Sequence, residues 1–298
     1  DAWDIDPEFE KNVAGQPELT NIEVVEKNDI QDVLRFTWKI SNSEIEQDMV
    51  LSHFHKRIDF KTKVRWDESH KLLKVSFPVD IRSTTATYEI PFGTGERATH
   101  NNTTWESAQF EVSGHKFADL SEANYGISLL NDSKYGYDIK GQTMRLSLLR
   151  APKWPDDTAD IGEHEFTYSL YPHAGSWQEA HTVRRGYELN QPVVVQKAEA
   201  QEGKLPTTHS FIQVDDSHVV VDTVKRAENS EGIVVRVYES SGGRNGITLK
   251  PSFTAQKVDE TNLLEETMVA DVATDDVLET ELKPYEIKTY NFHQIEES

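Results

Sequence analysis

Leu129-Leu-Asn-Asp-Ser-Lys-Tyr-Gly-Tyr-Asp-Ile139 is followed closely by Met144-Arg-Leu-Ser-Leu-Leu-Arg150. These two segments predict an apolar strand, a short polar loop closed by a glycine, and a second strand that returns. The loop places a carboxylate, an ammonium group and a phenol next to one another, on Asp132, Lys134 and Tyr135. Polar side chains on a short loop between rigid strands are typical of sites that bind polar ligands.

The rest of the chain also has the pattern of β-strands. Residues 33–40 and 58–66 alternate apolar and polar side chains, and in the second segment Ile58, Phe60, Val64 and Trp66 share one face. A period of two is the signature of a strand with one buried side. Many short segments of this kind, separated by turn residues, predict an all-β protein built from sandwiches rather than a parallel α/β sheet.

One helix and one domain boundary are expected. Ser176 and Glu179 form a capping box, which predicts a short connecting helix from residue 176 to residue 190. A polar segment without period follows, and divides the chain into domains at 1–200 and 205–298. The second domain has the higher density of negative charge. Its 94 residues include 18 acidic and 8 basic side chains, a net charge of -10, whereas the 204 residues before it have a net charge of -11.

Composition limits the functions open to the chain. Its 298 residues suggest about two domains. A net charge of -21 argues against binding to nucleic acid or to anionic membranes, which recruit Lys and Arg. The absence of cysteine excludes disulfides and thiolate metal sites and favours a cytoplasmic location. The chain has no apolar run long enough to span a membrane. It opens with neither a signal peptide nor an initiator methionine, so we expect it to be a fragment of a longer protein or a trimmed one.

No motif for a complete catalytic site is present. His53 and His55 would share one strand face and could supply two zinc ligands, but no spacing supplies a third, and a solvated strand face is the better interpretation. Asp67 and Glu68 could include the acid of a glycosidase, but a hairpin turn lined by charged residues is the better interpretation. Motifs for a serine nucleophile, a phosphate-binding loop or a zinc protease are absent from the sequence.

A series of longer motifs identifies the family that the chain resembles. In order along the chain they are Asp1-Ala-Trp-Asp-Ile-Asp6, Asp67-Glu-Ser-His-Lys-Leu-Leu-Lys-Val75, Ile90-Pro-Phe-Gly-Thr-Gly-Glu-Arg97, the loop quoted above, Tyr171-Pro-His-Ala-Gly175, Arg236-Val-Tyr-Glu239 and Leu282-Lys-Pro-Tyr-Glu-Ile-Lys-Thr-Tyr290. They resemble the C-terminal half of α-mannosidases of glycoside hydrolase family 38, in the cytosolic or bacterial branch. The resemblance implies a large β-supersandwich like that of galactose mutarotases, followed by a smaller β-sandwich.

The same resemblance implies an incomplete enzyme. Family members hydrolyse terminal α-mannosides with retention, and a separate N-terminal α/β barrel carries the nucleophile and most of a zinc site. We therefore expect the chain to hold no catalytic residue and no metal ligand, to be inactive alone, and to have the barrel and α-mannoside oligosaccharides as partners. Asp132, Lys134 and Tyr135 are expected to bind the sugar, with Glu96 and Arg97 as further candidates.

Two other functions stay open at this point. A carbohydrate-binding or mutarotase-like module would act without a barrel, but a mutarotase needs a His acid and a Glu base in one pocket. His164 and Glu165 are adjacent on a predicted strand and would face opposite sides. A structural module that forms homo-oligomers is the second alternative, and the acidic C-terminal sandwich suits it best.

Overall fold

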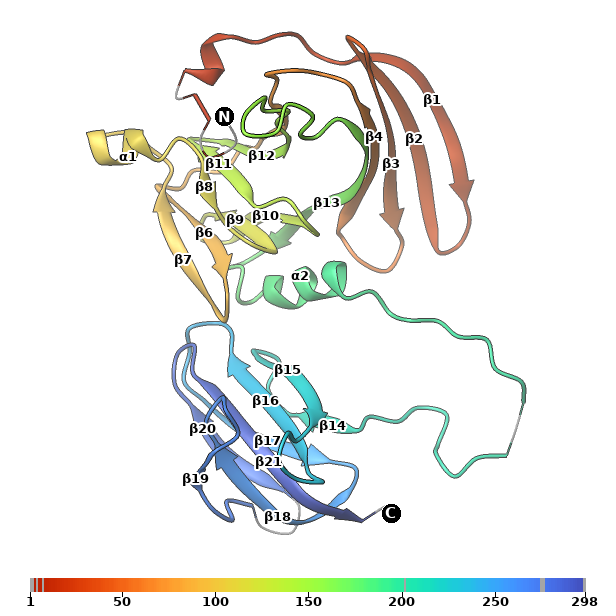
Figure 1. The fold of residues 1–298 in the computed structure, drawn as a ribbon, viewed down its shortest axis with the longest axis vertical. Coiled ribbons are helices and arrows are strands. Elements are labelled where there is room, and N and C mark those ends of the chain that lie inside the picture. The colour runs from red at the N-terminus through yellow and green to blue at the C-terminus, as the bar shows by residue number, and fades with distance from the viewer. Residues whose placement is uncertain (1–2, 4, 7, 201, 274–276, 297–298) are drawn as a thin grey trace. The chain divides into compact units, whose positions relative to one another are not determined.

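The computed structural model describes residues 3, 5–6, 8–200, 202–273 and 277–296 (Figure 1). Asp1, Ala2 and Asp4 of the first motif therefore lie outside the described residues. The fold is mostly β, as predicted, and the chain divides into two compact units. The first comprises residues 1–90 and 95–192, and the second comprises residues 91–94 and 193–298. The domain limits 1–200 and 205–298 stay a prediction.

The first unit contains two antiparallel sheets. The larger sheet has nine strands in the order β1-β2-β3-β4-β13-β10-β9-β6-β7, and the smaller has four in the order β5-β12-β11-β8. The strands of the larger sheet are β1 (Glu18–Lys27), β2 (Gln31–Ile40), β3 (Ser43–Ser52), β4 (Ile58–Trp66), β6 (Thr85–Ile90), β7 (Gly93–Ala98), β9 (Phe117–Ser121), β10 (Tyr125–Asn131) and β13 (Gly162–Ala174). Those of the smaller sheet are β5 (Leu73–Pro78), β8 (Val112–Ser113), β11 (Gly136–Lys140) and β12 (Thr143–Leu149).

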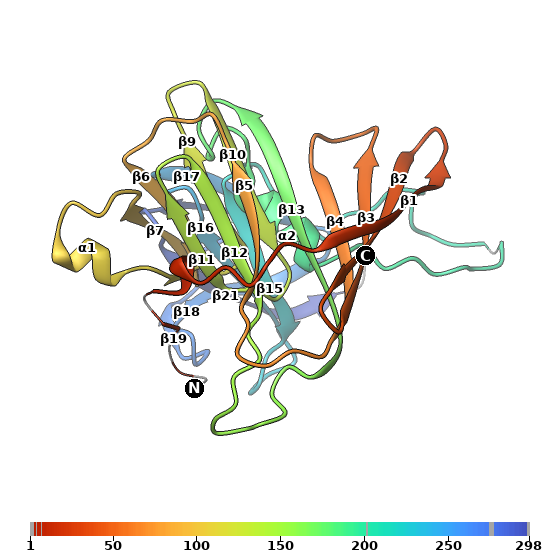
Figure 2. The same ribbon diagram turned by 90° about the horizontal axis from the view of Figure 1, so that it is seen from above.

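The first four strands form a meander with two different faces, and Figure 2 shows β1 at its free end. Directly paired residues share a face of a sheet. A row here is the set of residues paired across the four strands, read from β1 to β4. One face has three such rows: the first is Leu19, Trp38, Ile45 and Val64, the second is Ile22, Phe36, Gln47 and Thr62, and the third is Val24, Leu34, Met49 and Phe60. On the other face they are Glu18, Lys39, Glu44 and Arg65; Asn21, Thr37, Glu46 and Lys63; Glu23, Arg35, Asp48 and Lys61. The meander is thus apolar on one side and charged on the other.

The core of the first unit lies between the two sheets. Trp66, Phe166 and Leu129 of the larger sheet pack in one cluster with Tyr137 and Leu146 of the smaller one. The alternation predicted for residues 58–66 is confirmed, since Val64 and Trp66 are buried while the intervening Lys63 and Arg65 are exposed.

Two α-helices occur in the described residues, where the sequence predicted one. Helix α1 (Thr104–Ala108) was missed, although Thr103 and Glu106 form a capping box at its start. The predicted connecting helix exists as α2 (Thr182–Asn190), and begins six residues later than expected. The bonds between Ser176 and Glu179 are present, but they close a separate turn before the helix. A short 3-10 helix spans Phe9–Lys11.

The second unit is built from a three-stranded and a five-stranded sheet. Their strands are β14 (Ile212–Val214), β17 (Asn245–Pro251) and β20 (Leu278–Leu282) in the first, and β15 (Val219–Arg226), β16 (Ile233–Glu239), β18 (Thr254–Thr261), β19 (Thr267–Val269) and β21 (Ile287–Glu296) in the second. Val235, Leu249, Val258 and Phe292 share its core. It is the smaller β-sandwich that the sequence predicts.

One buried carboxylate organises a turn of the second unit. Glu239 accepts hydrogen bonds from the backbone N–H groups of Ser241, Gly242 and Tyr285, at 2.8, 2.8 and 3.1 Å. Burial acts to raise the pKa of the Glu239 carboxyl, but these bonds and that of the Ser241 hydroxyl outweigh it, so the pKa lies below its ordinary value.

Candidate functional site

The loop after β10 is held by a buried amide at its first residue. Asn131 is 0% exposed. Its side-chain nitrogen donates to the backbone oxygen of His115, at 2.8 Å, and to the Tyr137 hydroxyl. Its side-chain oxygen accepts from the backbone N–H of Lys134, at 2.7 Å. The strand therefore ends in a turn whose backbone is held by the buried Asn131 side chain. This contact fixes the position of the residues that follow.

Asp132 is bound to the neighbouring strand β13. Its carboxylate accepts from the backbone N–H of Thr167 at 2.9 Å, and its own N–H donates to the Thr167 oxygen at 3.1 Å. The other carboxylate oxygen accepts from the Ser133 hydroxyl at 3.0 Å. These contacts occupy both carboxylate oxygens of Asp132 and give it a positioning role in the loop.

Lys134 is the cation of the loop, and it is half-buried. Its ammonium nitrogen lies 4.6 Å from the centre of the Phe166 ring, a cation–π contact. Burial lowers the pKa of Lys134, and the carboxylates of Asp160 and Asp132 offset this effect only in part. The side chain is therefore a partly desolvated donor, which strengthens any hydrogen bond it makes to a ligand.

Tyr135 lies at the side of an open cavity of about 540 Å³. Its ring is 48% exposed and meets the ring of His115 edge-on, at 5.3 Å between centres. The aromatic and polar residues that line the cavity with it are Trp3, Phe110, Glu111, Ser113, Ser147, Arg150 and Asp160. Aromatic surface and hydrogen-bonding groups thus meet in one hollow, the mixture expected of a small-molecule site.

Three charged residues of this cavity, Glu111, Arg150 and Asp160, were not predicted from the sequence. Glu111 receives the Lys74 ammonium at 2.9 Å and the Ser147 hydroxyl. Asp160 accepts from the backbone N–H groups of Arg150 and Ala151, at 2.8 and 2.9 Å. Arg150 is the last residue of the segment 144–150 and could have been predicted as a site residue on that ground. Glu111 and Asp160 are polar residues next to strands, and nothing else in the sequence marks them as site residues.

Glu96 and Arg97 lie on β7, away from the residues that line this cavity. The Arg97 guanidinium stacks on the buried ring of Tyr88 at 4.7 Å. One of its nitrogens is buried without a hydrogen-bond partner in the described part of the chain. Arg97 and Tyr88 line a separate hollow of about 10 Å³, too small for a sugar, and Glu96 is exposed. Their role in binding stays a prediction.

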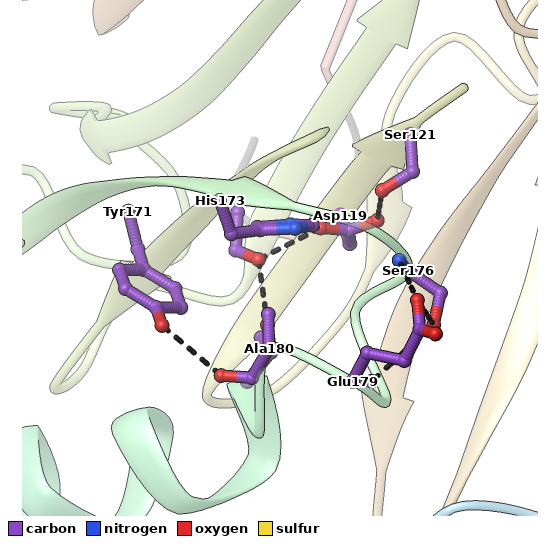
Figure 3. A network of polar contacts seen from close by, with 9 residues as sticks. Asp119, Ser121, Tyr171, His173, Ser176, Glu179 and Ala180 are labelled. Atoms are coloured by element: carbon purple, nitrogen blue, oxygen red, sulfur yellow. Dashed lines mark hydrogen bonds and ion pairs between the residues drawn. The ribbon is translucent and has the colours of Figure 1, made fainter. Parts of the chain in front are cut away.

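A second polar cluster lies on the opposite face of the larger sheet (Figure 3). The Asp119 carboxylate accepts from the hydroxyls of Ser121 and Ser128 and meets a ring nitrogen of His173 at 2.8 Å. Ser128 in turn lies 3.0 Å from the Thr182 hydroxyl at the start of α2. Both serines bond to the carboxylate rather than to the histidine, so no hydroxyl is activated as a nucleophile. The cluster fixes α2 to the sheet.

The other candidates from the sequence do not form a catalytic or metal site. His53 lies 3.3 Å from Asp32, and no group of three metal-ligating side chains exists among the described residues. Glu68 is buried and binds Asn42, Ser43 and Lys71, which is a structural turn. These residues do not fit a zinc ion.

His164 and Glu165 face opposite sides of β13, as their adjacency predicts. His164 is paired with Val64 on the apolar face, whereas Glu165 binds Lys63 on the charged face, at 2.9 Å. Both residues border an open hollow of about 320 Å³, but their side chains face opposite sides of the strand, which argues against a mutarotase-type acid and base here.

Comparison with known proteins gives consistent matches. The model of the glycosyl hydrolases family 38 C-terminal domain matches residues 1–158, and that of the family 38 C-terminal beta sandwich domain matches residues 218–290. Alpha-mannosidase G of Dictyostelium discoideum is 44% identical over 84% of this chain and 24% of its own length. Human alpha-mannosidase 2C1 is 43% identical over 89% of this chain and 26% of its own length.

A solved structure agrees in fold. An alpha-mannosidase from Enterococcus faecalis V583 superimposes with a TM-score of 0.80 at 19% identity, over 93% of this chain and 35% of that one. These matches first define a class, the C-terminal β domains of glycoside hydrolases. More particularly, the chain belongs to glycosyl hydrolase family 38 and is homologous to its α-mannosidases. It spans about a quarter of the length of the curated relatives it matches.

No helix in the described ranges is long and apolar enough to cross a membrane.

Proposed function

We propose that this chain is the C-terminal portion of a retaining, cytoplasmic α-mannosidase that hydrolyses terminal α-mannosides. Its loop at Asp132, Lys134 and Tyr135 would complete the sugar pocket of a catalytic barrel that lies outside this chain. The observation that carries the proposal is the position of the loop: Asn131 anchors it, and Tyr135 borders the 540 Å³ cavity.

The chemistry of the loop suits a sugar. A pyranose presents hydroxyls that both donate and accept, and an apolar face that packs on aromatic rings. The Lys134 ammonium donates, the Tyr135 hydroxyl can do either, and the ring of Phe110 lines the same cavity as Tyr135. The fixed strands on each side of the loop would keep these groups in place when a ligand binds.

The carboxylates near the cavity do not supply the reaction itself. Retaining hydrolysis needs a nucleophile and an acid/base carboxyl about 5–5.5 Å apart across the scissile bond. Asp160 and Asp132 are held by backbone N–H groups, and Glu111 is paired with Lys74. These contacts hold each carboxylate in a structural role. We therefore assign catalysis, together with the zinc that the family resemblance implies, to the barrel.

The test uses the full-length enzyme that contains this chain. Lys134→Met should lower kcat/KM on an α-mannoside by about 10–100-fold, because a hydrogen bond to a charged group contributes about 1.5–3 kcal/mol. Tyr135→Phe should lower it by about 2–10-fold, the effect of a neutral hydrogen bond. Lys56→Met, which changes an exposed lysine just before β4, is the matched control. Unchanged kcat/KM in both variants would refute the role of the loop.

A further inference from the structure

Apolar side chains of β1 and β2 are left uncovered in the first unit. On β1, Leu19, Ile22 and Val24 are 40%, 52% and 64% exposed. Their partners on β2 are Trp38, Phe36 and Leu34, all of them partly exposed. Contiguous exposed apolar surface of this kind marks an interaction site in a folded protein. We call the five residues Leu19, Ile22, Val24, Leu34 and Phe36 the arm face.

The arm face continues the core but extends beyond the cover of the smaller sheet. In the row through Leu19, exposure falls from 40% at Leu19 to 2% at Val64 of β4. The row through Ile22 ends at Phe166 of β13, the ring beneath the Lys134 ammonium. A partner on the arm face would therefore follow the same side of the sheet toward the candidate sugar loop.

The opposite face of the same strands shows that this is not ordinary surface. There Arg35 binds both carboxylate oxygens of Asp48, at 2.7 and 2.8 Å, and lies 3.4 Å from Glu46. Such charged rows are stable in contact with water. The meander therefore has the binary pattern of a strand layer with one solvated and one covered side.

The chemistry of the arm face selects an apolar polypeptide rather than a sugar. Its five side chains carry no hydrogen-bonding group. Next to them in the row, the Gln47 amide already donates to Thr62 and to the Tyr168 hydroxyl, at 3.0 and 2.7 Å. The edge of β1 is interrupted by bulges between Leu19 and Asn21 and between Val24 and Glu26, which opposes edge-to-edge pairing with another strand.

We propose that the arm face binds the part of the α-mannosidase polypeptide that lies outside this chain, through an apolar surface of that part. The relatives are about four times as long as the region matched here, so most of their chain is available to cover it. The inference rests on the proposed function only in requiring a longer α-mannosidase chain. It assigns a second area of contact beside the sugar loop, one that positions the loop without touching substrate.

Thiol labelling of the full-length protein tests this directly. Ile22→Cys places a thiol on the arm face, and Glu23→Cys places the matched control one residue along the same strand, on the charged face. The labelled peptides are identified by mass spectrometry, and this chain adds no cysteine of its own. We expect Ile22→Cys to react at least about tenfold more slowly than Glu23→Cys, since access requires a local opening of the contact.

Equal labelling rates at the two positions would overturn the proposal. Slow labelling that becomes fast on dilution to the monomer would also overturn it, because a second copy of the protein would then be the occupant. Covalent footprinting of Ile22 in the unmodified protein gives the same answer if the variants fail to fold. Labelling does not depend on turnover, so unchanged kinetics of both Lys134→Met and Tyr135→Phe would refute the sugar role and leave this result standing.

Discussion

Replacing Asn131 by alanine tests whether a buried amide holds the candidate loop in place. The side chain makes three hydrogen bonds, to the His115 oxygen, the Tyr137 hydroxyl and the Lys134 N–H. Alanine removes all three and fills less of the space. The variant should therefore lose stability and also loosen the residues that follow Asn131.

The expected loss of stability depends on which hydrogen bonds the partners of Asn131 still make in the variant. The Tyr137 hydroxyl still donates to the His115 oxygen at 3.1 Å, so these two groups retain one another. The N–H of Lys134 loses the acceptor that closes the turn. A hydrogen bond contributes about 0.5–1.5 kcal/mol and an unsatisfied buried group costs about 1–3 kcal/mol. We expect the free energy of unfolding of the first unit to fall by about 3–4 kcal/mol.

Tryptophan fluorescence during urea unfolding measures this unit alone. All six tryptophans precede residue 193: Trp3, Trp38, Trp66, Trp105, Trp154 and Trp177. The matched control is Asn124→Ala, an exposed asparagine before β10, which should change stability by less than about 0.5 kcal/mol. A loss below about 1 kcal/mol for Asn131→Ala would refute the anchoring role, because even one unsatisfied buried group costs that much.

Two further predictions concern other buried groups. Gly126→Ala should destabilise the first unit by about 1–3 kcal/mol, since a β-carbon there would clash with the Ser121 hydroxyl oxygen. Gly95→Ala, whose β-carbon meets nothing within 4 Å, should be nearly neutral in the same fluorescence assay. Glu239→Gln should cost the second unit about 2 kcal/mol at pH 7, measured by circular dichroism in urea. Because the pKa of Glu239 is lower in the folded state, the wild type loses this stability as the pH falls below the ordinary value of 4.5, and a variant with the same pH dependence would refute the linkage.

The strands were predictable because their signal is local. Residues 58–66 alternate sharply, and they form β4 with the same bounds. Helix α1 was missed because its five residues show no apolar period, so only the capping box of Thr103 and Glu106 marks it. The start of α2 was misplaced for a related reason: the bonds between Ser176 and Glu179 satisfy a turn as well as a helix, and the sequence does not distinguish the two.

The candidate site was predictable only where it is continuous in sequence. Asp132, Lys134 and Tyr135 belong to one loop, so any fold that makes the loop brings them together. Of these three, Tyr135 borders the cavity, while Asp132 and Lys134 are not among its lining residues. Glu111 and Asp160 reach the cavity from other segments, through strand pairing that has no local signal. The exposure of the arm face could not be predicted from the sequence either. Apolar alternation predicts that one face of a strand is covered but does not say which element covers it.

The polar loop is anchored through the buried side chain of Asn131 and through a contact from helix α2. Asn190 at the end of α2 donates its amide to the backbone oxygen of Asn131 at 2.9 Å, and so ties the helix to the first residue of the loop. The helix is itself fixed to the sheet through Thr182 and Ser128. In each of these contacts, apolar residues of the same size could replace both partners together at little cost to a sheet alone. Their arrangement makes sense if the loop must hold its position when a ligand binds, since a freely moving loop would lose affinity to the entropy of ordering.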